Sequence, residues 1–167
     1  MDTMVLHTQK WLNETYGDDE RYNSIEENGR TGWPTIYALT RALQIELGIE
    51  NTADSFGPTT RSRYTPLKKK SGNNNQFGIL QGALWCKGYD PGHYYSEGND
   101  GFSCVFDEKV EKAVIRLKKD AGMLDPDGVV TTNIMSALLS MDAFQLLSSY
   151  GGKDAIRHLP TRNESRI

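Results

Sequence analysis

The strongest constraint on this chain is an internal repeat: residues 5–60 and residues 77–142 share one layout. Each segment opens with a short helix pattern, passes through a polar glycine-rich loop, enters a longer amphipathic helix and then shows a turn with a pair of threonines. A layout that recurs along a chain indicates one small structural unit used twice. We therefore predict an all-α chain made of two similar small helical-bundle units in tandem.

The first copy predicts two helices joined by a long loop. The loop 17–32 is rich in Gly, Asp, Glu and Asn, which suits turns. The second helix should begin near Pro34, because proline fits a first helical turn, and should stop at Gly48. The apolar or amphipathic positions recur at helical spacing; they are Val5, Gln9, Leu12 and Tyr16 in the first helix and Ile36, Leu39, Leu43 and Leu47 in the second.

The second copy repeats this order and adds a third helix. Its helices should end at Gly88 and Gly122, and Thr131 or Thr132 should cap the last one. The apolar positions share a face in each helix; they are Phe77, Leu80 and Leu84, then Val110, Ala113, Val114, Leu117 and Ala121, and finally Ile134, Leu138 and Met141.

These patterns divide the chain into four parts: a first unit (1–64), a basic polar linker (65–76), a second unit (77–150) and a polar tail (151–167). Units of about 65 residues lie near the lower limit for independent stability, so we expect the two to pack on each other. The basic linker is interpreted as a solvated spacer, with contact to an anionic polymer as the alternative.

Composition narrows the classes of function. The net charge is −3 and the pI is near 5.6, which argues against a general nucleic-acid binder, since such proteins usually carry a basic face. No run approaches the roughly 20 apolar residues of a membrane span. The first residues lack a basic region followed by an apolar stretch, so we expect no classical signal peptide.

The same ordered motifs occur in both copies. They are Val5, Gln9, Leu12, Asn28-Gly29, Leu43-Gln44 and Gly48-Ile49 in the first, and Leu80-Gln81, Leu84, Ala113-Val114, Gly122-Met123 and Asp127-Gly128 in the second. This set resembles the peptidoglycan-binding domain attached to cell-wall amidases, peptidases and other lytic hydrolases. That family shows V-x-x-L-Q-x-x-L, then A-V-x-x-F-Q-x-x-x-G-L, then a D-G turn.

The resemblance implies a compact three-helix unit with a shallow surface for muramyl peptide or glycan, and it implies that catalysis belongs to a partner domain. Three positions of the second copy depart from the pattern: Cys104 replaces a usual Gly, Val110 a usual Thr and Lys118 a usual Gln. These departures bear on ligand binding by the second copy more than on its fold.

The chain shows no sequence motif for catalysis. The histidines, His7, His93 and His158, have no partner at zinc-ligand spacing, and the sequence lacks a nucleophile-elbow motif. We therefore predict no catalytic residue, no metal ligand and no cofactor. His93 is interpreted as a solvated loop residue. Cys86 and Cys104 are interpreted as two free thiols, with a disulfide as the alternative.

Aromatic and amide side chains in the loops are the candidates for ligand binding, because aromatic rings lie against the apolar faces of sugars and amides bond hydroxyl and peptide groups. Core packing is the alternative for Trp33, and we assign Phe106, Trp85 and Leu43 to the core. The candidate ligand-binding residues are Trp33, Tyr37, Asn28, Tyr94, Tyr95 and Phe102.

The favoured function is a non-catalytic peptidoglycan-binding module that targets a cell-wall hydrolase to its polymer. The partners expected are peptidoglycan and a catalytic hydrolase domain, with no nucleic acid. One alternative is that the chain is itself a cell-wall amidase or peptidase, which includes zinc-dependent types. The other is a helix-turn-helix DNA-binding protein, since short helices joined by glycine turns look alike in outline.

Overall fold

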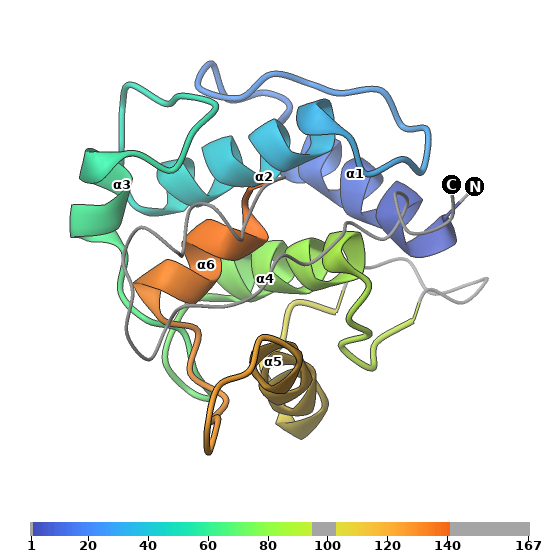
Figure 1. Ribbon diagram of the computed structural model, residues 1–167. Coiled ribbons are helices and arrows are strands. Elements are labelled where there is room, and N and C mark those ends of the chain that lie inside the picture. Colours follow the sequence, from blue (N-terminus) through green and yellow to red (C-terminus); the bar gives the residue numbers. More distant parts are fainter. Residues whose placement is uncertain (1, 95–102, 141–167) are drawn as a thin grey trace.

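The computed structural model describes residues 2–94 and 103–140, and within them the chain forms six α-helices (Figure 1). This confirms the predicted all-α class. The helices are α1 (Thr3–Tyr16), α2 (Trp33–Glu46), α3 (Pro58–Arg63), α4 (Asn74–Lys87), α5 (Glu108–Asp120) and α6 (Thr132–Leu138). None of the helices in these residues is long and apolar enough to cross a membrane.

The helix ends follow the local chemistry of the sequence. Pro34 is the second residue of α2, and Gly88 closes α4 in the left-handed conformation with φ of 84°, where a side chain would be strained. Thr131 is the N-cap of α6, and its hydroxyl accepts a hydrogen bond from the Ile134 amide at 3.3 Å. The predicted boundaries of these helices are therefore confirmed to within one or two residues.

Helix α4 is the centre of the fold. It packs against α1, α2, α5 and α6, and every residue from Phe77 to Lys87 is buried; Figure 1 shows it surrounded by these helices. The sequence predicted a single apolar stripe for this segment, and that prediction was too narrow. A helix buried all round needs small or apolar residues on every face, as this one has.

Two glycines let α1 approach α4 closely. A Cβ at Gly82 would lie 2.5 Å from Cγ2 of Thr8, and one at Gly78 would lie 2.7 Å from Cζ2 of Trp11. Neither position leaves room for a methyl group, so the contact between the first helix of each predicted unit depends on glycine.

The two predicted units share one hydrophobic core. A single cluster of buried side chains runs from Val5 and Leu39 to Val114 and Ile134, which agrees with the expectation that the units pack on each other. Leu67, inside the predicted linker, is 1% exposed and pairs with Val130 as an antiparallel bridge. Part of that segment is therefore core rather than solvated spacer. The packing does not test whether each unit folds alone, and the boundaries at 64 and 77 stay a prediction.

Buried glutamines on α1 and α4 hold the loop that follows each helix, at corresponding places in the two copies. The Gln9 side chain donates to Asn28 Oδ1 at 3.1 Å and to Thr35 Oγ1 at 2.9 Å, and it accepts from the Gly29 amide at 2.8 Å. Gln81 donates to the carbonyls of Ser103 and Val105. The repeat seen in the sequence therefore corresponds to a repeated loop anchor.

A second pair of buried polar side chains anchors the second turn of each copy. Gln44 donates to the Ser55 carbonyl at 3.0 Å. At the matching position Lys118, only 3% exposed in its side chain, pairs with Asp127 at 2.9 Å. Lysine at this position thus replaces the neutral amide with an ion pair, which is a structural reason for the departure from the family pattern.

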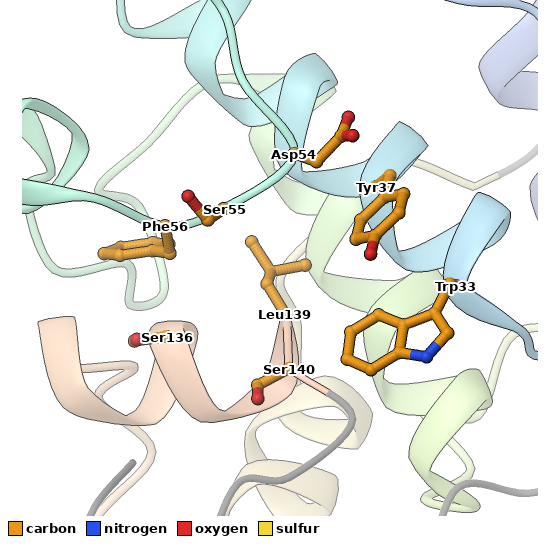
Figure 2. Close-up of a pocket in the computed structure, with 8 residues that line it drawn as sticks. All are labelled: Trp33, Tyr37, Asp54, Ser55, Phe56, Ser136, Leu139 and Ser140. Atoms are coloured by element: carbon orange, nitrogen blue, oxygen red, sulfur yellow. The ribbon is translucent and has the colours of Figure 1, made fainter.

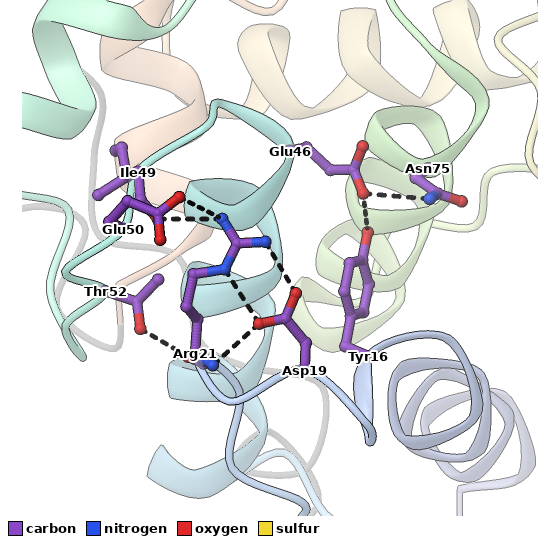
Figure 3. A network of polar contacts seen from close by, with 8 residues as sticks. All are labelled: Tyr16, Asp19, Arg21, Glu46, Ile49, Glu50, Thr52 and Asn75. Carbon is purple, nitrogen blue, oxygen red and sulfur yellow. Dashed lines mark hydrogen bonds and ion pairs between the residues drawn. The ribbon is translucent and has the colours of Figure 1, made fainter.

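A polar network ties the loop 17–32 to the segment that follows α2 (Figure 3). Arg21 binds both carboxylate oxygens of Asp19, at 3.0 and 2.8 Å, and these bonds hold the pKa of Asp19 at about 2. Thr52 donates to the Arg21 carbonyl at 2.6 Å. Nearby, Tyr16 donates to Glu46 at 2.8 Å. The long loop is therefore fixed by polar contacts, although few apolar residues lie in it.

Candidate functional site

A pocket of about 340 Å³ lies where the two predicted units meet (Figure 2). One wall comes from α2 and the turn before α3, and the other comes from α6 and the two residues that follow it. The lining residues are Trp33, Tyr37, Asp54, Ser55, Phe56, Ser136, Leu139 and Ser140. Because its walls are 80 residues and more apart in the sequence, the pocket exists only when both halves of the domain are assembled.

Trp33 and Tyr37 form the aromatic wall of this pocket. They are four residues apart on α2 and therefore lie on one face. Their rings are stacked, with centroids 5.4 Å apart and planes inclined by 28°. Trp33 is 49% exposed, so the alternative that places its ring in the core is wrong. The sequence predicted both residues for the site, and the structure brings them together.

The loop before α2 sets the position of Trp33. Thr35 donates to the Arg30 carbonyl at 3.0 Å and accepts from Gln9. Asn28 Oδ1 accepts from the Arg30 amide at 3.0 Å and from Gln9 at 3.1 Å. Asn28 is thus engaged in holding the loop that leads into α2 and is not among the lining residues of the pocket.

The polar side-chain groups of the pocket are hydroxyls, the indole N–H of Trp33 and one carboxylate. Asp54 is half exposed and pairs with Arg41 at 2.9 Å. Ser136 is 1% exposed, and its hydroxyl has no hydrogen-bond partner among the described residues. None of the eight lining residues is Lys, Arg or His. The pocket therefore combines an aromatic face with neutral hydroxyls, which suits an uncharged polar ligand better than an anion.

The aromatic residues predicted in the second copy do not join this pocket. Tyr94 is 61% exposed, its hydroxyl bonds Asp90, and its ring lies 5.8 Å from that of Trp85. Tyr95 and Phe102 lie outside the described residues. The second copy contributes α6 to the pocket instead.

The titratable residues form structural contacts. His93 Nε2 lies 2.9 Å from Asp107 Oδ2, and its side chain is 20% exposed, so the interpretation of His93 as a solvated loop residue was wrong. Asp107 also caps α5 through the amides of Lys109 and Val110. Cys86 and Cys104 are not joined by a disulfide, in agreement with their interpretation as two thiols. Within residues 2–94 and 103–140, no three His, Cys, Asp or Glu side chains are grouped so that they could hold a metal ion.

The residues of the pocket that sequence reasoning missed are those outside α2. Phe56 was not among the candidate binding residues, and the segment of α6 was considered only for its cap and its apolar edge. Phe106, Trp85 and Leu43 are 7%, 2% and 0% exposed, as their assignment to the core predicted. A signal for Phe56 existed, because an aromatic residue in a polar turn beside a helix with two further aromatics suggests a shared surface.

Comparison with known proteins identifies relatives that are longer than this chain. It is 54% identical over 162 residues to a protein of Bacillus subtilis (strain 168) named Uncharacterized protein YbfG, covering 95% of this chain and 21% of that protein. It is 47% identical over 163 residues to Uncharacterized protein FadG of the same organism, covering 95% of this chain and 27% of that protein. The chain thus spans only about a fifth to a quarter of the length of these relatives. No solved structure matches it.

A family of domains matches nearly all of the described chain as one unit. The family described as "FadG/YbfG, PGDB-like domain", where PGDB means peptidoglycan-binding-like, matches residues 2–139. The match covers α1 to α6 and includes both walls of the pocket. It agrees with the resemblance to peptidoglycan-binding domains and treats the two sequence copies as a single domain. The chain belongs to the FadG/YbfG family of peptidoglycan-binding-like domains.

Proposed function

We propose that this chain is a non-catalytic module that binds the peptidoglycan of the bacterial cell wall and thereby holds an attached wall hydrolase on its polymer. The observation that carries the proposal is the stacked pair Trp33 and Tyr37 on the wall of a pocket. Exposed aromatic faces beside hydroxyl groups are typical of sites that hold carbohydrate and muramyl groups.

The family and the relatives support the coarse part of this proposal. The chain covers 21% and 27% of these two relatives, and we propose that the remainder of such a longer protein holds further domains beside the peptidoglycan-binding-like domain. The presence of an attached hydrolase in this protein, and action at the wall of a Gram-positive bacterium or its phage, are parts of the proposal. The proposal also includes the idea that each half of the chain corresponds to the binding unit attached to wall amidases.

Co-sedimentation of the purified chain with Gram-positive sacculi tests this function, with a turbidity assay on the same tubes. The proposal predicts that the chain appears in the pellet and that the suspension does not clear. Clearing by the chain alone would support a hydrolase instead. Absence from the pellet at low salt would contradict the proposal. A gel shift with random duplex DNA, for which no shift is expected, tests the DNA-binding alternative.

A further inference from the structure

We infer that the pocket between α2 and α6 takes an uncharged N-acetylhexosamine unit of the glycan strand, and that it does not take the peptide stem. This inference rests on the proposed function and names the part of the polymer that the site recognises. It is carried by three properties of the pocket: its charge, its aromatic wall and a buried hydroxyl.

The charge of the pocket disfavours the peptide stem. The stem carries free carboxylates, which proteins usually bind with arginine, lysine or several amide N–H groups. None of the pocket-lining side chains is cationic. The one carboxylate there, that of Asp54, is already paired with Arg41 at 2.9 Å, so this ion pair offers no unpaired cation to the stem. A neutral sugar needs no such cation.

The aromatic wall has the shape and position for a sugar ring. Trp33 is half exposed, and the ring of Tyr37, which also lines the pocket, is stacked on it with the centroids 5.4 Å apart. The stack fixes the indole plane before a ligand arrives, and a rigid aromatic face costs little conformational entropy on binding. A volume of about 340 Å³ lies at the lower end of the range for small-molecule sites, which fits one sugar unit rather than a long segment.

The wall of the pocket opposite Trp33 indicates that the bound sugar carries an acetamido group. Ser136 on α6 is 1% exposed, and its hydroxyl lacks a hydrogen-bond partner among the described residues. Phe56 and Leu139 line the same pocket and supply apolar surface (Figure 2). An acetamide offers a carbonyl for such a hydroxyl and a methyl group for such a surface. A sugar with a free hydroxyl in place of the acetamide offers neither, so the pocket should prefer the N-acetylated sugar.

Calorimetric titration of the full chain with three soluble ligands tests the assignment. They are the β-1,4-linked tetramer of N-acetylglucosamine, cellotetraose as the matched sugar without acetamido groups, and a free stem pentapeptide. We expect the acetylated tetramer to bind about tenfold more tightly than cellotetraose, the ratio that one hydrogen bond and a buried methyl group produce. The stem peptide should show no heat of binding.

Two variants test the contribution of each wall to binding separately. Ser136→Ala removes a hydroxyl that has no partner within the described residues, so it should fold, and it should reduce the preference for the acetylated tetramer to within about threefold. Trp33→Ala should weaken both sugars by about tenfold or more. Leu124→Ala is the control, because Leu124 is 94% exposed and does not line the pocket; it should bind as the natural sequence does.

The outcomes distinguish this inference from the proposed function. If sacculi bind in a Trp33-dependent way while only the stem peptide competes, the inference is wrong and the proposed function stands. Equal binding of the acetylated tetramer and cellotetraose would also overturn the inference. If neither sacculi nor any soluble ligand binds, the proposed function itself fails, and the inference fails with it.

Discussion

The Tyr64 hydroxyl donates to the carbonyl of Val130 at 2.7 Å, across 66 residues of sequence. Both residues are buried, and Val130 also exchanges backbone hydrogen bonds with Leu67. These contacts join the end of the first predicted unit to the turn before α6. They make the position of α6, and with it one wall of the pocket, dependent on the first half of the chain.

Tyr64→Phe should lower the free energy of unfolding by about 1 kcal/mol, because the buried carbonyl keeps only its bond from Leu67. Urea denaturation followed by circular dichroism and tryptophan fluorescence measures this. The chain should unfold in a single transition by both probes. Tyr94→Phe, at an exposed ring, should change stability little. Two separate transitions would contradict the shared core and would support two independent units.

Gly82→Ala should destabilise the domain by roughly 1–3 kcal/mol, the usual cost of overpacking. The added methyl group would lie 2.5 Å from Thr8 Cγ2 and 3.3 Å from Leu39 Cδ2, so α1 and α2 would have to move apart from α4. Gly57→Ala is the matched control, because a Cβ there meets nothing within 4 Å. Thermal unfolding measures both. Equal stability of the two variants would contradict the close packing of α1 on α4.

Most of the helical layout could be predicted from the sequence because its ends carry local signals. Thr131 and Gly88 mark a start and a stop by chemistry that does not depend on the rest of the fold. The central position of α4 was missed. The continuous apolar stretch around Gly78 and Gly82 was interpreted as a helix with only one apolar face. Its burial on all sides depends on neighbours that are distant in sequence.

Only the part of the candidate site that depends on local helical spacing could be predicted from the sequence. Trp33 and Tyr37 share one helix, so helical spacing places them together. Phe56 and Ser136 join them only through tertiary packing, which the pattern of a single segment does not contain. Ligand contact by Asn28 stays a prediction; in the structure its Oδ1 accepts a hydrogen bond from Gln9 and belongs to the loop anchor.

Stability should fall as the pH is lowered from about 4 towards 2. Hydrogen bonds from Arg21 hold the pKa of Asp19 at about 2 in the folded chain, against an ordinary value of 3.8. A carboxyl whose pKa is depressed by folding stabilises the fold above its unfolded value, and this contribution is lost as the pH falls through the folded value.

Asp19→Asn should therefore flatten the dependence of the free energy of unfolding on pH between about 4 and 2. Denaturant titrations at several pH values measure the slope. The pKa of Asp127 is also lowered, chiefly by its hydrogen bond from Lys118, so some acid dependence should remain. An unchanged slope in Asp19→Asn would show that the contact with Arg21 does not persist in solution.

Both cysteines should react slowly with a thiol reagent in the folded chain. Cys86 is buried, and burial raises the pKa of the Cys104 thiol to about 11, so little of the reactive thiolate exists at pH 8. Titration with a chromogenic disulfide should show full reaction only after denaturation. Rapid labelling of one equivalent under native conditions would contradict the packing of Cys104 against Gly78.

The measurement that tests the central claim most directly is the affinity of three chains for purified Gram-positive sacculi: the natural sequence, Trp33→Ala and Leu124→Ala. Trp33 is half exposed on the pocket wall, and Leu124 is exposed away from it, so neither change should unfold the domain. The account predicts saturable binding by the natural sequence and by Leu124→Ala, and at least tenfold weaker binding by Trp33→Ala. Equal binding by all three chains would contradict the assignment of the pocket as the site that holds the cell wall.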